Sequence, residues 1–211
     1  MLKDIHSHHL LSDPEDVLLS VCYQDIEKSE LQKAKHLSVG IHPWFITAED
    51  LPVQMEWMQQ MLQDARVCAV GEAGLDKRCD TSFELQEQAF RWQIECAESH
   101  RLPLIIHGVK CASELIRLKK EYRPSSPWII HGFRGKPQQA TEYLRHGFYL
   151  SFGEKYADES LRIVPDNRFF IETDESKVPI QKLFQHAAEV REISFAQLED
   201  SVFENINHLF Y

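Results

Sequence analysis

Residues 4–8 read Asp-Ile-His-Ser-His, an acid and two imidazoles spaced by two almost at the start of the chain. If this stretch is a β-strand, side chains two apart point to the same face, so Asp4, His6 and His8 project together. Such imidazoles can hold a divalent metal ion when further ligands come from elsewhere in the chain. Two exposed histidines in a loop produce the same pattern, so the rest of the sequence has to decide between the two interpretations.

The composition predicts a single globular domain over residues 1–211, because 43% of the residues are hydrophobic and a chain of this length buries a substantial core. Its five cysteines form no Cys-x-x-Cys pair, which indicates a reduced compartment. We find no signal peptide and no apolar run of about eighteen residues, so we expect a cytoplasmic protein with no membrane contact and no obligate protein partner. The net charge of −10 disfavours broad coating of nucleic acid but permits a local site whose metal ions supply positive charge.

Short apolar runs alternate with helix-like segments, a rhythm typical of parallel α/β folds. Helical spacing predicts helices over residues 50–63, 83–99, 137–146 and 195–210. The apolar runs predict strands near residues 2–7, 17–22, 37–41, 67–72, 103–107, 128–131, 147–152 and 168–173. Eight such strands with crossover helices predict a (β/α)8 TIM-like barrel.

The predicted barrel is shortened at two places. Only about ten residues separate the first two strands, where a crossover normally needs a dozen or more. We therefore expect the first crossover helix to be missing or reduced to a turn. The segment after Asp174 also looks short for a full barrel unit.

Imidazoles and carboxylates follow six of the predicted strands, at the end where barrel enzymes build their active sites. They are His6, His8, His42, Glu72, His107, His131 and Asp174. Leaving His42 aside, four histidines and two carboxylates suit two divalent ions, because imidazole favours ions such as Zn and Mn while carboxylates tolerate Mg and bridge ions. Two ions can activate a water and stabilise a displaced phosphoryl group, which predicts a hydrolase.

Eight short strings span nearly the whole chain: DIHSH (4–8), GIHP (40–43), GEAGLD (71–76), QEQAFRWQ (86–93), LPLIIH (102–107), IIHGFRG (129–135), GFYLSFG (147–153) and IETD (171–174). In order and spacing they resemble the TatD-type metal-dependent deoxyribonucleases of the amidohydrolase superfamily. The resemblance implies the barrel inferred above, two divalent metal ions (Mg, Mn or Zn) and hydrolysis of phosphodiester bonds, often in DNA.

The same resemblance implies a role for each residue that matches the family's motifs, with Glu72 and Asp174 as the catalytic carboxylates. Asp174 would also orient or deprotonate the nucleophilic water. As ligands, His6, His8 and Asp174 would hold the first ion, Glu72 would bridge, and His107 and His131 would hold the second.

Substrate contacts depart from the family pattern. Lys110 stands near the position of a family arginine, and Arg134 is a candidate phosphate contact because its planar fork suits two phosphate oxygens. His42 either touches substrate, supports the metal ligands or has a structural role at a turn before Pro43. Asp76 either orients a metal ligand, as such ligands require, or acts as a turn acid.

Three functions are compatible with these residues. The first is a two-metal hydrolase of phosphodiesters, either exonuclease or endonuclease, with DNA as substrate. The second keeps the metals and changes the substrate to a small phosphoester or amide, and the third is a barrel retained as a non-catalytic scaffold.

The sequence makes less specific predictions for three aromatic residues and one basic run. We expect Trp44, Phe45 and Phe133 to line the cleft wall or the core, with stacking on a nucleic-acid base as the alternative. The run RLKK at 117–120 is expected to form the solvent-exposed face of a helix.

Overall fold

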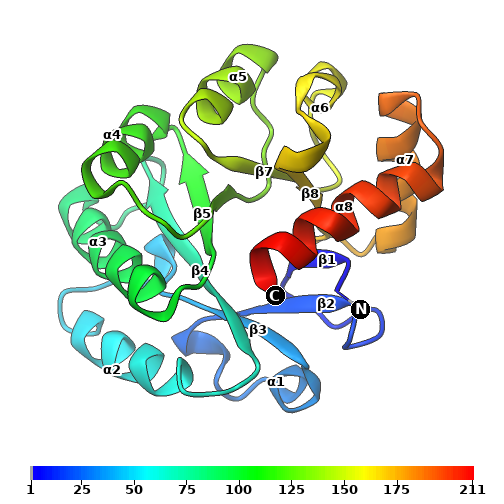
Figure 1. The fold of residues 1–211 in the computed structure, drawn as a ribbon. Helices are drawn as coiled ribbons and strands as arrows, with labels where there is room; N and C mark the ends of the chain where they lie inside the picture. The colour runs from blue at the N-terminus through cyan, green and yellow to red at the C-terminus, as the bar shows by residue number, and fades with distance from the viewer. Residues whose placement is uncertain (1) are drawn as a thin grey trace.

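Eight parallel strands in sequence order form the centre of the computed structural model, which describes residues 2–211 (Figure 1). All eight predicted strands are confirmed, and the fourth and fifth extend beyond their predicted ends. The strands are β1 (Asp4–Ser7), β2 (Val17–Val21), β3 (His36–Val39), β4 (Val67–Asp76), β5 (Leu104–Val109), β6 (Trp128–Ile130), β7 (Tyr149–Phe152) and β8 (Phe169–Ile171).

The barrel closes where β1 meets the residues that follow β8. Ser7 and Asp174 form a parallel bridge. The Asp174 amide donates to the His6 carbonyl at 2.9 Å, and the His8 amide donates to the Asp174 carbonyl at 3.1 Å. The side chain of Asp4 supports this seam lower down, since its Oδ1 accepts the Thr173 amide at 3.0 Å. The predicted (β/α)8 TIM-like barrel is therefore correct, and its seam lies at the predicted metal ligands.

Helices surround the strands on the outside (Figure 1). All four predicted helices are confirmed, and the chain between β1 and β2 makes only a turn, as expected from its length. The segment after Asp174 nevertheless holds the full helix α7. The α-helices are α1 (Ser29–Lys33), α2 (Leu51–Met61), α3 (Phe83–His100), α4 (Ala112–Tyr122), α5 (Pro137–Arg145), α6 (Asp158–Ile163), α7 (Ile180–Arg191) and α8 (Phe195–Phe210), joined by the 3-10 turns η1 (Tyr23–Asp25), η2 (Pro43–Phe45) and η3 (Asp166–Arg168).

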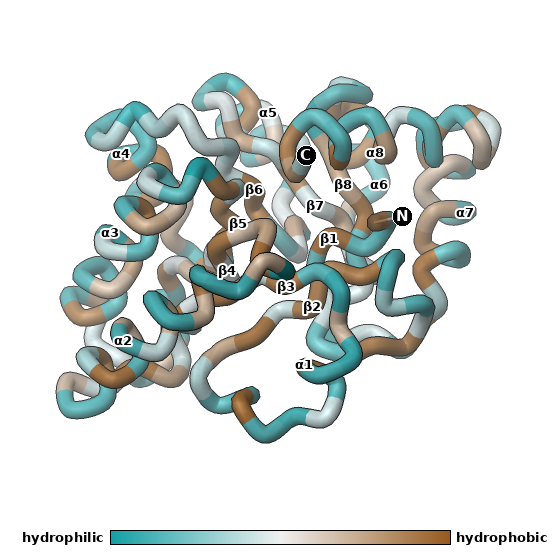
Figure 2. Tube along the Cα trace, turned by 60° about the horizontal axis from the view of Figure 1, so that its bottom comes forward, coloured by the Kyte–Doolittle hydropathy of each residue, from teal (hydrophilic) through white to brown (hydrophobic). Residues whose placement is uncertain are grey.

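The strands are almost continuously buried, as expected for parallel strands covered by helices. Figure 2 shows hydrophobic residues along the central strands, with hydrophilic residues distributed over the outer helices and loops. Helix α8 lies at the amino-terminal end of β8, where the Asn205 amide donates to the carbonyls of Asp166 and Phe169. Among residues 2–211, none of the helices has the length and apolar character that a membrane span requires.

The run RLKK in α4 is only partly a solvent-exposed face. Arg117 and Lys120 are exposed, as expected, but Lys119 turns inward. Its Nζ lies 5.0 Å from the ring centroid of Trp128 and 4.8 Å from that of Phe148. The reason is helical spacing, because Lys119 follows the buried Leu115 by four residues and so shares its face.

Candidate metal centre

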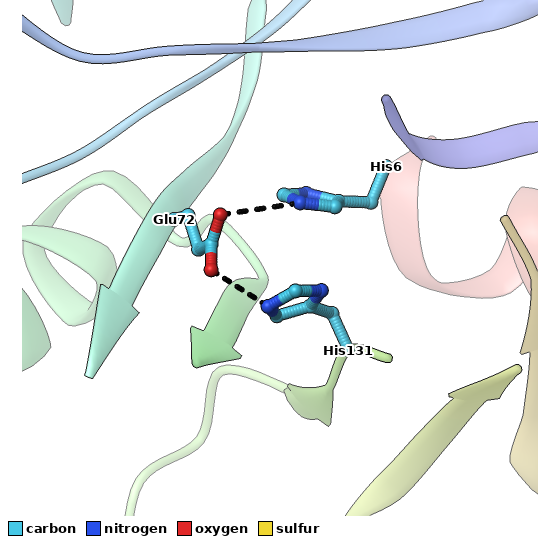
Figure 3. A group of neighbouring side chains, drawn as sticks. All are labelled: His6, Glu72 and His131. Atoms are coloured by element: carbon cyan, nitrogen blue, oxygen red, sulfur yellow. Dashed lines mark ion pairs between the residues drawn. The ribbon is translucent and has the colours of Figure 1, made fainter. Parts of the chain in front are cut away.

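Glu72, near the middle of β4, is the centre of the site. The side chain is buried, and its two oxygens face imidazoles from four other strands or strand ends. Figure 3 shows the carboxylate between His6 and His131. Its Oε2 lies 3.3 Å from the Nε2 atoms of both His6 and His8, and its Oε1 lies 2.7 Å from His131 Nε2 and from His107 Nδ1. One carboxylate therefore links the first strand to the fifth and sixth.

Asp174 completes the cluster from the far side of the barrel seam. Its Oδ1 lies 3.9 Å from His6 Nε2 and 3.7 Å from His8 Nε2. Its backbone has a φ of 56°, a left-handed conformation that Asp tolerates better than most residues. This turn brings the carboxylate back toward β1, so all six residues predicted as metal ligands converge on one end of the barrel.

The donor set fits divalent metal ions by two observations. Both ring nitrogens of His6 are buried, and neither has a hydrogen-bond partner within residues 2–211. In addition, ligand atoms of His6, His8 and Asp174 lie within 4.8 Å of one another, as do those of His6, Glu72 and His131. Imidazole and carboxylate together suit Zn, Mn or Mg, so the chemistry of the residues agrees with the predicted cofactors.

Two imidazoles of the cluster each contact a second carboxylate through the ring nitrogen that does not face Glu72. His107 Nε2 lies 3.1 Å from Asp76 Oδ2, and His131 Nδ1 lies 3.3 Å from Glu172 Oε1. Such outer carboxylates fix the orientation of metal-binding imidazoles and raise their basicity. The structure thus places Asp76 beside a proposed metal ligand, as its predicted role of orienting such a ligand requires.

Glu172 is a residue that sequence reasoning missed. It is fully buried, and its Oε1 also accepts the Gly132 amide at 2.6 Å. A signal was present, because Glu172 follows the apolar strand β8 directly, just as the predicted ligands follow theirs. It stands two residues before Asp174, the acid that matches the family motif.

The charges within the cluster stabilise one another. Burial alone would raise the pKa of Glu72, but the positive charge of His131 and hydrogen bonds from His107, His131 and His42 hold this pKa well below its usual value. Burial alone would lower the pKa of His131, but the carboxylates of Glu72 and Glu172 hold it well above its usual value. Each member of the Glu72–His131 pair therefore favours the charged form of the other.

His42 joins the cluster rather than pointing away from it. Its Nε2 lies 3.1 Å from Glu72 Oε1, while its Nδ1 accepts the Trp44 amide at 3.1 Å. Because Nδ1 accepts a hydrogen bond, the proton of the neutral ring sits on Nε2 and is donated to Glu72. The structure thus brings His42 to Glu72 as a donor, and its predicted substrate contact stays a prediction.

The two predicted basic contacts lie in different places. Arg134 is largely exposed, and its Nη2 lies 3.9 Å from Asp174 Oδ2. It lines a cavity of about 180 Å³ together with Lys155 and Asp174. Lys110 is exposed beyond the end of β5, and no ion pair among residues 2–211 joins it to the cluster. The cavity beside Asp174 therefore has one of the predicted phosphate contacts and lacks the other.

Comparison with known proteins agrees with this geometry. A family model described as TatD related DNase matches residues 21–211. The uncharacterized metal-dependent hydrolase YabD of Bacillus subtilis is 29% identical over 83% of this chain and 77% of its own length. The 3'-5' ssDNA/RNA exonuclease TatD of Enterobacter lignolyticus is 26% identical over 65% of this chain and 56% of its own length.

Solved structures share the fold. The TatD homolog YjjV of Escherichia coli K12 superposes with a TM-score of 0.83 at 21% identity, covering 99% of this chain and 97% of that one. A TatD family hydrolase from Entamoeba histolytica gives a TM-score of 0.79 at 17% identity, with 100% and 98% covered. Since the family model extends over far more than half of the sequence, this chain belongs to the TatD-related family of metal-dependent hydrolases.

Proposed function

We propose that this protein is a divalent-metal-dependent phosphodiesterase that cleaves nucleic acid, with DNA as the substrate class. The observation that supports it most is the cluster around Glu72, in which four predicted imidazole ligands and Asp174 meet at the carboxyl ends of the strands. Barrel enzymes place their chemistry at this end. Relatives named as ssDNA/RNA exonucleases support the choice of nucleic acid.

In this proposal the chain's own residues hold the ions, bind the phosphate or position the imidazoles. Bound divalent ions would act as Lewis acids on a phosphoryl group and activate a water. Asp174 would orient that water and accept its proton, since its carboxylate faces both the imidazoles and the cavity. Glu72 would bridge the ions. The ligands of the first ion would be His6, His8 and Asp174, and those of the second would be His107 and His131.

Arg134 would bind the phosphate from the cavity side. Its guanidinium lies next to the Asp174 carboxylate, and its exposure leaves the planar fork free for substrate oxygens. Asp76 and Glu172 would hold His107 and His131 in place, as their contacts with the outer ring nitrogens indicate. Neither carboxylate needs to touch substrate for this role.

A second candidate is a hydrolase of small phosphoesters or amides. It is favoured by the net charge of −10 and by the small size of the cavity of about 180 Å³. A nucleic-acid strand meets only two cationic side chains there, Arg134 and Lys155. The two candidates share the metal centre and differ in the substrate.

One assay separates the candidates and the scaffold alternative. The purified protein is loaded with Mg, Mn or Zn and tested on single-stranded DNA, duplex DNA, small phosphoesters and amides. The proposal expects metal-dependent cleavage of DNA. If DNA is inert with every metal while a small ester is turned over, the second candidate replaces the nuclease. No turnover of any substrate would favour the non-catalytic scaffold.

A further inference from the structure

Trp44 and Phe45 form an exposed aromatic pair beside the metal centre. The two residues belong to η2, which directly follows His42, and their exposed fractions are 55% and 43%. Phe133, the third aromatic residue predicted to line the cleft wall or the core, is buried in the core. Single exposed hydrophobic residues need no explanation, but two neighbouring rings at the edge of a buried polar cluster do.

The indole of Trp44 is held in one orientation. Its Nε1 donates to Asp76 Oδ2 at 2.7 Å, the same oxygen that lies 3.1 Å from His107 Nε2. The rings of His42 and His107 meet the indole almost at right angles, at 85° and 80°, with centroids 5.0 and 5.6 Å away. No ring among residues 2–211 stacks on it face to face.

Phe45 adds a second ring to the same surface. Its centroid lies 5.4 Å from that of His42, whose Nε2 is 3.1 Å from Glu72. Trp44 thus contacts the proposed metal ligand His107 directly, and Phe45 is one imidazole away from Glu72. A substrate whose phosphate lies at the centre would bring its adjoining bases within reach of these rings.

The few positive charges at the site favour base stacking as a further source of substrate affinity. The chain has a formal net charge of −10, and among residues 2–211 the cations that line the cavity beside Asp174 are Arg134 and Lys155. Apart from the proposed metal ions, the protein therefore gives a phosphate backbone few cationic contacts there. Stacking on an aromatic ring contributes about 1–3 kcal/mol per base and does not depend on cations.

We propose that Trp44 and Phe45 form a stacking surface for unpaired bases next to the scissile phosphate. This inference rests on the proposed nuclease function. A base within a duplex is covered on both faces by its neighbours, so only an unpaired base can use the platform. The pinned indole provides the flat face and Phe45 extends it.

The test compares two oligonucleotides and three proteins. One substrate is a single-stranded DNA with all bases, and the other carries abasic residues around the cleavage position. The proteins are wild type, Trp44→Leu and Trp44→Phe. Both variants lose the hydrogen bond to Asp76, so the difference between them isolates the aromatic face. Phe195→Leu, at an exposed ring on α8, is the matched control.

For wild type and Phe195→Leu, kcat/KM is expected to be about 5- to 150-fold higher with bases present, the range that corresponds to one stacked base. Trp44→Leu should lose most of this preference, and Trp44→Phe should keep most of it. Phe45→Leu should show a smaller loss than Trp44→Leu. Equal kcat/KM for both oligonucleotides in a wild type that cleaves DNA would overturn the platform and leave the proposed function intact.

A binding measurement covers the case in which the proposed function fails. Tryptophan fluorescence of Asp174→Asn is titrated with the same oligonucleotides. The titration is repeated with Trp44→Phe added, which leaves only the signals of Trp57, Trp92 and Trp128, and these signals are subtracted. Quenching that requires both Trp44 and intact bases supports the platform. If the wild type cleaves no nucleic acid, the proposed function fails, and absence of this quenching then overturns the platform as well.

Discussion

The two ends of the barrel bury charge in opposite ways. At the carboxyl ends of the strands, buried imidazoles and carboxylates face one another, as in the pair His131 and Glu72 at 2.7 Å. At the amino ends, Lys119 lies over Trp128 and Phe148 and has no carboxylate within 4.0 Å among the residues described. Paired charges keep their charged form on burial, whereas a lone ammonium is pushed toward its neutral form. One end is thus organised for chemistry and the other for packing.

The largest expected effect comes from Asp174 at the chemical end. Asp174→Asn keeps the backbone conformation, because Asn also tolerates the left-handed region, but removes the charge and the proposed proton acceptor. We expect kcat to fall by about 10²- to 10⁴-fold, the usual contribution of a general base. Steady-state kinetics and far-ultraviolet circular dichroism check activity and folding. Asp200→Asn, at an exposed position on α8, is the control, and wild-type rates in Asp174→Asn would refute the role.

Glu172 tests whether the outer carboxylates matter. Glu172→Gln preserves the acceptor for the Gly132 amide but removes the charge behind His131. Loss of such a partner typically weakens metal binding about 10- to 100-fold. Calorimetric titration of Mn or Zn into metal-free protein measures this. Unchanged affinity, equal to that of the exposed control Glu142→Gln, would make Glu172 a packing residue only.

Arg134 tests the substrate side of the same end. Arg134→Ala should raise KM for a phosphodiester more than it lowers kcat, because the guanidinium is proposed to bind phosphate and not to move a proton. The side chain is 63% exposed, so we expect a modest change of about fivefold, near 1 kcal/mol. Kinetics of this variant beside Arg145→Ala, an exposed arginine at the end of α5, give the comparison. Identical kinetics would return Arg134 to ordinary surface charge.

The smallest effect is expected at the packing end. Burial, helped by the nearby positive charge of Arg168, lowers the pKa of Lys119 from 10.5 to about 8. A lowered amine pKa means that the unfolded chain binds the proton more tightly, so the stability linked to this group is present above pH 10.5 and is lost as the pH falls toward 8.

Lys119→Met should therefore raise the free energy of unfolding at pH 7 by about 1 kcal/mol, after allowance for the solvent that reaches the ammonium. The variant should also lack the wild-type rise in stability between pH 8 and 10.5. Urea denaturation at several pH values measures both. A less stable Lys119→Met would show that attraction of the ammonium to the two rings outweighs its desolvation.

Sequence reasoning succeeded where topology alone determines position. Residues that follow parallel strands must meet at one end of a barrel, so the convergence of His6, Glu72 and Asp174 follows from the strand pattern. It failed where side-chain direction decides. The hydrogen bond from Trp44 to Asp76 and the contact of Glu172 with His131 depend on rotamers that no periodicity encodes.

Lys119 was a different kind of miss, because its spacing of four from Leu115 was visible in the sequence. The charge of the run favours an exposed face, whereas helical phase places Lys119 on the buried side. A lysine stem can cover apolar rings while its ammonium stays near solvent. The position of Arg134 beside Asp174 was not predicted, since the sequence indicated only a candidate phosphate contact.

Metal stoichiometry is the direct test of the two-metal centre. Mass spectrometry of the metal content of wild type and Glu72→Gln, after equilibration with Mn or Zn and removal of free ion, counts the ions held by the cluster. We expect about two ions per chain in wild type, as a two-metal centre requires, and less than one in Glu72→Gln, because the proposed bridging carboxylate is gone. Equal metal content in the two proteins, or none in either, would contradict it.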